Sequence, residues 1–201
     1  MKTPSDPDLR RLVDGVASRH AETARVFFDQ QADLLVSVSR RICEAFRAGG
    51  RLLLFGNGGS AAEAQGVATE YVGRFVSDRQ ALPAIALTTD TSALTAIGND
   101  YGFERVFARQ IEALGRAGDI AYAISTSGNS RNVVAGVAAA HQAGMKSIGL
   151  LGRGGGELGA LVTWPLIVPS DETARVQEVH LMIGHTLCAL VEAQMFGGGA
   201  A

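Results

Sequence analysis

Short apolar runs alternate with longer helix-like segments over most of this chain, and this alternation constrains the fold more than any other feature. The apolar runs are Arg51–Phe55, Pro83–Leu87, Ile120–Ile124, Ser147–Leu151 and Pro165–Val168. The helix-like segments are Ser60–Arg74, Phe103–Leu114, Asn132–Ala143, Glu157–Val162 and about Thr173 to Met195. Strands that alternate with helices predict a parallel sheet with helices on both faces. We therefore expect an α/β fold with a central, mostly parallel five-stranded sheet.

A long helical region precedes this core. Phe28, Leu35 and Ile42 recur every seven residues between about Asp8 and Ala48, and the pair Gly49-Gly50 ends the pattern. We predict one domain over residues 1–201, with residues 1–48 as a helical extension and 49–195 as the α/β core with its last helix. Such a long helix is typical of a contact with a partner subunit.

Composition narrows the class of protein. The net charge of −2 comes without a long run of one sign, which argues against nucleic-acid binding. The first six residues lack the apolar core of a signal peptide, and no apolar run approaches the roughly 18 to 20 residues that span a bilayer. Cys43 and Cys188 lie in apolar stretches and predict buried free thiols. We expect a cytoplasmic protein with neither a nucleic-acid nor a membrane partner.

The turn Gly56-Asn57-Gly58-Gly59-Ser60 directly follows the first predicted strand. Glycines allow backbone N–H groups to approach an anion closely, and the helix that follows presents its positive end. Ser60 can cap that helix or donate its hydroxyl to a phosphate. The turn is neither a P-loop nor the Gly-x-Gly-x-x-Gly motif.

A second polar turn, Ser125-Thr126-Ser127-Gly128-Asn129-Ser130, follows the strand Ile120–Ile124. Five of its six residues bear a hydroxyl or an amide. Each turn alone is equally compatible with an ordinary helix cap. Because ligands of parallel sheets sit beyond the carboxyl ends of the strands, two such turns together favour a phosphate monoester site.

Both turns resemble the signature loops of the sugar isomerase (SIS) superfamily, and within it the chain resembles the phosphoheptose isomerases. The resemblance continues through Leu82–Leu87, Thr95–Gly102, Arg175–His180 and His185, and covers essentially the whole chain. It implies an SIS-type three-layer fold, a homotetramer, and isomerisation of sedoheptulose 7-phosphate to D-glycero-D-manno-heptose 7-phosphate for lipopolysaccharide precursors.

The resemblance also implies roles for single residues. Glu70 would be the base and His185 the acid of an enediol mechanism. The positions implied to bind the phosphate or the sugar are Asn57, Gly58, Gly59, Ser60, Arg74, Asn99, Asp100, Ser125, Thr126, Ser127, Ser130, Thr173 and Gln177.

Zinc-binding members of the family use a histidine, a glutamate four residues later, a glutamine and a C-terminal histidine. Here the resemblance assigns Glu70, Gln177 and His185 to three of these positions, and the position of the first histidine is Gly66. Glycine has no ligating side chain, so we expect weak or absent Zn²⁺ binding. Gly66 either makes room for substrate or is a substitution that disables the metal site.

The spacing of Gln177 and His185 poses a geometric problem. Eight residues of continuous helix separate their backbones by about 12 Å, which is too far for both to ligate one ion. Either the last helix starts after Gln177, or the two residues come from different subunits. We favour active sites at subunit interfaces.

Two other functions remain open at this point. One is a non-catalytic SIS protein that binds a replication initiator; such relatives lack the residues that match Glu70 and His185. The other is an isomerase or sensor for a different sugar phosphate, whose loops would look the same.

Overall fold

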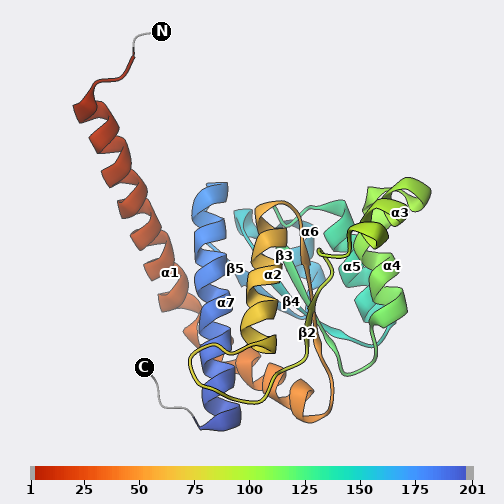
Figure 1. Cartoon of the computed structure of the whole chain (residues 1–201). Coiled ribbons are helices and arrows are strands. Elements are labelled where there is room, and N and C mark those ends of the chain that lie inside the picture. Colours follow the sequence, from red (N-terminus) through yellow and green to blue (C-terminus); the bar gives the residue numbers. More distant parts are fainter. Residues whose placement is uncertain (1–2, 198–201) are drawn as a thin grey trace.

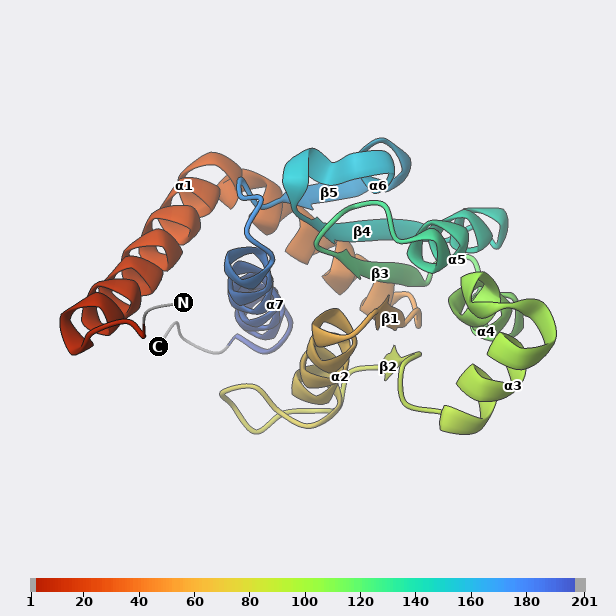
Figure 2. The ribbon, with the colours of Figure 1, turned by 90° about the horizontal axis from the view of Figure 1, so that it is seen from above.

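The computed structural model describes residues 3–197, which form a parallel sheet covered by helices on both faces (Figures 1 and 2). The strands run in the order β2-β1-β3-β4-β5, and every neighbouring pair is parallel. All five predicted strands are confirmed to within one residue at each end. Their bounds are β1 (Leu52–Gly56), β2 (Ala84–Ala86), β3 (Ile120–Ser125), β4 (Lys146–Leu151) and β5 (Trp164–Ile167).

The helices form the two outer layers. The bounds are α1 (Asp6–Arg47), α2 (Gly59–Val72), α3 (Thr91–Tyr101), α4 (Val106–Leu114), α5 (Arg131–Gln142), α6 (Gly156–Leu161) and α7 (Thr173–Phe196), with 3₁₀ turns η1 (Phe103–Arg105) and η2 (Arg153–Gly155). Helices α1, α2 and α7 cover one face of the sheet, and α4, α5 and α6 cover the other (Figure 2). The predicted three-layer α/β fold is thus confirmed. Helix α3 was not predicted, and the predicted segment Phe103–Leu114 begins as η1 and continues as α4.

The core divides at the sheet because successive strand residues point to opposite faces. In β1, Leu52 and Leu54 join the cluster beneath α1, α2 and α7, whereas Leu53 and Phe55 join the cluster beneath α4 and α5. All four are fully buried. A strand buried on both faces is typical of a parallel sheet and accounts for the continuous apolar run.

Helix α1 is a single helix of 42 residues, about 63 Å long at 1.5 Å per residue. Its C-terminal half packs against α7 and β5, and its N-terminal half leans away from the body of the molecule (Figure 1). Leu9, Leu12, Val13 and Val16 are exposed on that half. Their spacing places them on one helix face, so α1 carries an apolar stripe that its own chain does not cover.

Helix α7 is the central helix of its layer. Its 24 residues reach the length and apolar composition of a membrane-spanning helix, which was not anticipated from the sequence. However, α7 packs against both α1 and α2, and Val179, Ile183 and Leu187 are fully buried. Its apolar composition is therefore explained by its place in the hydrophobic core.

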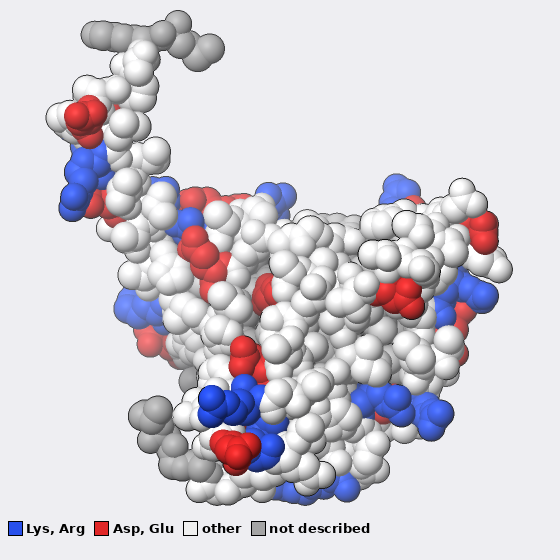
Figure 3. All heavy atoms as spheres, viewed as in Figure 1, with Lys and Arg blue, Asp and Glu red and all other residues white. Residues whose placement is uncertain are grey.

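The surface around α2 and α7 is shown in Figure 3. Acidic and basic side chains are interspersed on this face, with uncharged areas between them. Five large apolar side chains of α2, α7 and the segment after α2 are exposed, namely Val72, Val76, Leu181, Met182 and Phe196.

Candidate functional site

The two predicted phosphate-binding loops lie next to each other at the carboxyl edge of the sheet. Residues 56–60 leave β1 and residues 125–130 leave β3, and these strands are neighbours with Gly56 opposite Ile124. The strand order changes direction between β1 and β3. Such a topological switch point is where open α/β sheets bind ligands.

The first loop turns sharply into α2. Gly58 has a φ of 54°, a conformation that favours glycine, and directly precedes the helix. The buried Ser60 lies in the first turn of α2, and its backbone N–H donates a hydrogen bond to the carbonyl oxygen of Asn57 at 3.0 Å. The side-chain amides of Asn57 and Asn132 donate hydrogen bonds to each other's oxygen, both at 2.8 Å. This reciprocal pair holds the first loop against the start of α5.

The second loop gathers hydroxyl groups. The Ser125 hydroxyl oxygen lies 3.1 Å from that of Ser130 and 3.5 Å from that of Ser127. Gly128 has a φ of 67°, and a Cβ atom there would overlap the carbonyl oxygen of Gly155. The loop is therefore fixed against the backbone of η2. A cluster of hydroxyl groups beside a helix N-terminus suits an anion.

A groove runs from these loops between α2 and α7. Gly59, Glu63, Gly66 and Glu70 are spaced by four, three and four residues, so they share one face of α2. The cavity at the loop end of this groove has a volume of about 390 Å³. It is lined by Gly59, Ala62, Glu63, Gly66, Gln177, Glu178 and Leu181.

Glu70 and His185 lie farther along the same pair of helices. Both side chains are half-buried. Burial raises the pKa of Cys188 to about 12, and the negative charge of Glu70 contributes to that rise. Glu70 therefore approaches α7 at the turn that carries His185 and Cys188. Ten residues separate Ser60 from Glu70, which is about 15 Å along the helix axis.

Four other predicted site residues lie outside this groove. Arg74 is exposed just beyond α2, and Thr173, the first residue of α7, accepts a hydrogen bond from Arg153 at 3.1 Å. Asn99 and Asp100 are exposed on α3, joined to each other by a hydrogen bond of 2.8 Å. Helix α3 lies on the other side of the sheet from α7 (Figure 2). The structure therefore does not bring Asn99 and Asp100 to the groove of their own chain.

We compared the chain with protein-family models, with curated proteins and with solved structures. The SIS domain family model matches residues 17–152. A phosphoheptose isomerase from Roseiflexus sp. is 52% identical over 196 residues, covering 98% of this chain and 99% of the relative. The chain belongs to the phosphoheptose isomerase family.

Other members of the family are similar to this chain over most of its length. The phosphoheptose isomerase of Aquifex aeolicus is 54% identical over 172 residues, covering 86% of this chain and 90% of the relative. The solved phosphoheptose isomerase structure from Neisseria gonorrhoeae superposes with a TM-score of 0.88 at 42% identity. That match covers 92% of this chain and 99% of the other. The family resemblance therefore extends over nearly the whole chain.

The zinc-site positions of the phosphoheptose isomerase family do not form a site within one chain here. Helix α7 is continuous from Thr173 to Phe196, so the alternative that it starts after Gln177 is wrong. Gln177 lies at the loop end of the groove and His185 about 12 Å farther along. Gly66 offers no ligand, and residues 3–197 contain no group of three or more His, Cys, Asp or Glu side chains placed to hold a metal ion. The residues of a single chain thus do not fit zinc.

Glu63 is a residue of the groove that the sequence reasoning missed. It is 8% exposed, and its Oε1 atom is buried without a hydrogen-bond partner. Burial raises the pKa of the Glu63 carboxyl to about 8, so this side chain is largely neutral at pH 7. Its spacing from Gly59, Gly66 and Glu70 on one helix face was the available signal.

Glu63→Gln is expected to make stability less sensitive to pH. The wild-type carboxyl stays neutral in the folded chain up to about pH 8, whereas it ionises near pH 4.5 when unfolded. Stability contributed by Glu63 is therefore present below pH 4.5 and is lost as the pH rises towards 8, by an amount on the order of 4 kcal/mol. Urea denaturation at pH 5 and pH 9 should show a smaller loss in the variant than in the wild type. Equal losses would contradict the assignment.

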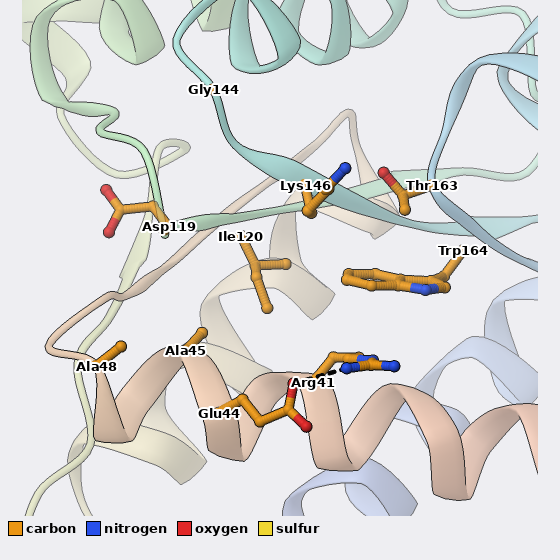
Figure 4. Close-up of a pocket in the computed structure, with 11 residues that line it drawn as sticks. Arg41, Glu44, Ala45, Ala48, Asp119, Ile120, Gly144, Lys146, Thr163 and Trp164 are labelled. Carbon is orange, nitrogen blue, oxygen red and sulfur yellow. Dashed lines mark hydrogen bonds and ion pairs between the residues drawn. The ribbon is translucent and has the colours of Figure 1, made fainter.

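A separate cavity of about 530 Å³ lies at the opposite edge of the sheet (Figure 4). Its walls come from the amino ends of β3, β4 and β5, including Lys146 and Trp164, and from the C-terminal end of α1. Arg41 and Glu44 on α1 form an ion pair of 2.9 Å in its wall. It contains none of the predicted site residues, whereas the cavity between α2 and α7 is lined by Gly59 and Gln177.

Proposed function

We propose that this chain is an isomerase that converts sedoheptulose 7-phosphate to D-glycero-D-manno-heptose 7-phosphate, a step towards lipopolysaccharide precursors. The observation that carries the proposal is the groove itself. Its cavity adjoins the polar loop at the N-terminus of α2, and a carboxylate (Glu70) and an imidazole (His185) lie farther along the same two helices. Relatives named phosphoheptose isomerase at about half identity over nearly the full length support the same reaction.

In the proposed mechanism the two loops bind the phosphate, and Glu70 and His185 transfer protons at the other end of the sugar. Ser60, Ser125, Thr126, Ser127 and Ser130, with the backbone of Gly58 and Gly59, hold the phosphate, and the sugar extends along α2. Glu70 removes a proton from C1 of the open-chain ketose, and His185 moves protons between the oxygens of C1 and C2. The enediol that forms is reprotonated at C2 to give the aldose. Asn57 braces the two loops, and Gln177 contacts the sugar.

The direct test is turnover by the purified protein. Sedoheptulose 7-phosphate should be converted to the aldose, detected by NMR or by an aldose-specific coupled assay, with and without added zinc. Absence of turnover under both conditions would refute the proposal. A panel of ketose phosphates in the same assay separates this reaction from isomerisation of another sugar.

The non-catalytic alternative is disfavoured by one observation. Glu70 and His185 are both present and lie on facing turns of α2 and α7. An adaptor that binds a replication initiator would not need either side chain. Capture of such an initiator together with no turnover would favour the adaptor.

Assembly into a homotetramer with active sites at subunit interfaces is part of the proposal. The uncovered stripe of α1 and the exposed apolar side chains around the groove support it, because large apolar patches mark interfaces. A neighbouring subunit would supply Asn99, Asp100 or a second α7 to a groove that lacks them. We expect zinc binding to be weak or absent, and the protein to act in the cytoplasm.

A further inference from the structure

The segment between α2 and β2, residues 73–83, is fastened to α7 by Glu192. This segment crosses the C-terminal half of α7 (Figure 1). The Glu192 Oε1 atom accepts hydrogen bonds from the backbone N–H of Val76 at 3.3 Å and of Ser77 at 2.7 Å. A surface loop of this length has no regular structure of its own to fix it, so Glu192 supplies its anchor.

Arg79 joins the same anchor to the end of α2. Its Nε donates to Glu192 Oε2 at 3.1 Å, and the two side chains are 2% and 6% exposed. Its two terminal nitrogens donate to the carbonyl oxygens of Glu70 at 2.6 Å and Tyr71 at 2.8 Å. These carbonyls belong to the last turn of α2, where carbonyl groups have no N–H donor within the helix. One guanidinium thus ties α2, the segment and α7 together.

The same segment presents an aromatic ring to the proposed acid. The Phe75 ring centroid lies 5.6 Å from that of His185, with 42° between the ring planes. Phe75 directly precedes Val76, whose N–H is held by Glu192. The residue in ring contact with His185 is therefore next to the residue that Glu192 holds.

Stability alone does not explain a buried ion pair here. Removing two charges from water is costly, and apolar residues of similar volume often replace buried pairs without loss of stability. Burial alone would raise the pKa of Glu192, but hydrogen bonds from Ser77, Arg79 and Val76 lower it below its ordinary value. The carboxylate is therefore charged at neutral pH and specifically bound.

We infer that Arg79 and Glu192 are positioning residues, which hold Glu70 and His185 in the mutual orientation that proton transfer needs. The inference rests on the proposed roles of Glu70 and His185. Neither Arg79 nor Glu192 contacts the groove cavity. They act through the last turn of α2 and through Phe75.

The test replaces the pair by apolar residues, Arg79→Met with Glu192→Leu. We expect kcat to fall about 10- to 100-fold, because small misplacements of reacting groups cost that much, with KM changed little. The imidazole NMR signals of His185 should also shift as Phe75 loses its fixed place. Glu192→Gln, which keeps an acceptor for the two N–H groups, should retain more activity than the double variant.

A matched control exists at the other edge of the sheet. Asp119 accepts hydrogen bonds from the backbone N–H of Arg51 and Arg116, both at 3.0 Å, and pairs with the Arg51 side chain at 3.6 Å. Asp119→Leu with Arg51→Met should leave kcat and the His185 signals unchanged.

The inference fails if the Arg79 and Glu192 double variant keeps wild-type kcat, if its His185 signals do not move, or if the control loses kcat equally. Inactive wild-type protein would refute the proposed function instead. In that case unchanged His185 signals in the double variant would still refute the inference.

Discussion

Glu70→Gln and His185→Gln are each expected to reduce turnover of sedoheptulose 7-phosphate by about 10²- to 10⁴-fold, the usual contribution of a positioned acid or base. Glutamine keeps the approximate size of both side chains but cannot exchange a proton. KM should change less than kcat, because the phosphate loops are intact. Steady-state kinetics and circular dichroism on the same samples provide the measurement.

Glu112→Gln and His141→Gln are suitable controls. Glu112 pairs with Arg105 on the far side of the sheet, and His141 lies beside Ser147 at the amino end of β4. Both controls should retain wild-type kcat. If Glu70→Gln or His185→Gln stays within about tenfold of the wild type, that residue is not the base or acid.

Mixing two inactive variants tests whether the site is shared between subunits. Gln177 and His185 cannot meet on one continuous α7, so a shared site takes them from different chains. Co-refolded Gln177→Ala and His185→Gln subunits should then regain activity that neither has alone. Activity equal to the sum of the separate variants would show that each chain completes its own site.

Gly66→His is expected to create a tighter zinc site. Apart from the neighbouring backbone of α2, no atom lies within 4 Å of the place where a Cβ would stand at Gly66, so a side chain can leave the helix there. The new imidazole would share a helix face with Glu70, four residues on. Because outer-shell partners alone change metal affinity by about 10- to 100-fold, a restored ligand should lower the Kd for zinc at least about tenfold. Competition with a chromophoric chelator measures this Kd.

Gly66→Ala is the matched control for this variant. It adds a Cβ atom and should stabilise the helix by roughly 0.5–1 kcal/mol, but it adds no ligand. Equal zinc affinity in the two variants would contradict the prediction. A raised KM in Gly66→His alone would favour the reading that Gly66 makes room for substrate.

The sequence predicted most of the sheet because its strands are buried on both faces. Leu52–Phe55 and Ile120–Ile124 are continuous apolar runs that no surface helix would carry. Helix α3 was missed because none of its residues is fully buried, and only Leu94 and Ile97 pack, partly buried, against the core. Its ends were nonetheless marked: Asp90 accepts a hydrogen bond from the N–H of Ala93 at 2.9 Å, and Gly102 follows the helix with a φ of 83°.

The candidate site was predicted in part. The loops at 56–60 and 125–130 could be placed together because parallel strands end at one edge of the sheet. The burial of the Glu63 carboxyl could not be predicted from the sequence, since it depends on how closely α7 approaches α2. For the same reason the anchor at Arg79 and Glu192, which are 113 residues apart, leaves no local pattern.

The separation of about 15 Å between Ser60 and Glu70 along α2 has a consequence for substrate choice. A sugar whose phosphate is held at the loops must extend its carbonyl carbon down the groove to reach the carboxylate. Shorter ketose phosphates would bind by the phosphate yet leave their reactive carbons out of reach. The groove then selects substrates by chain length, so that a pentulose phosphate would act as an inhibitor rather than as a substrate.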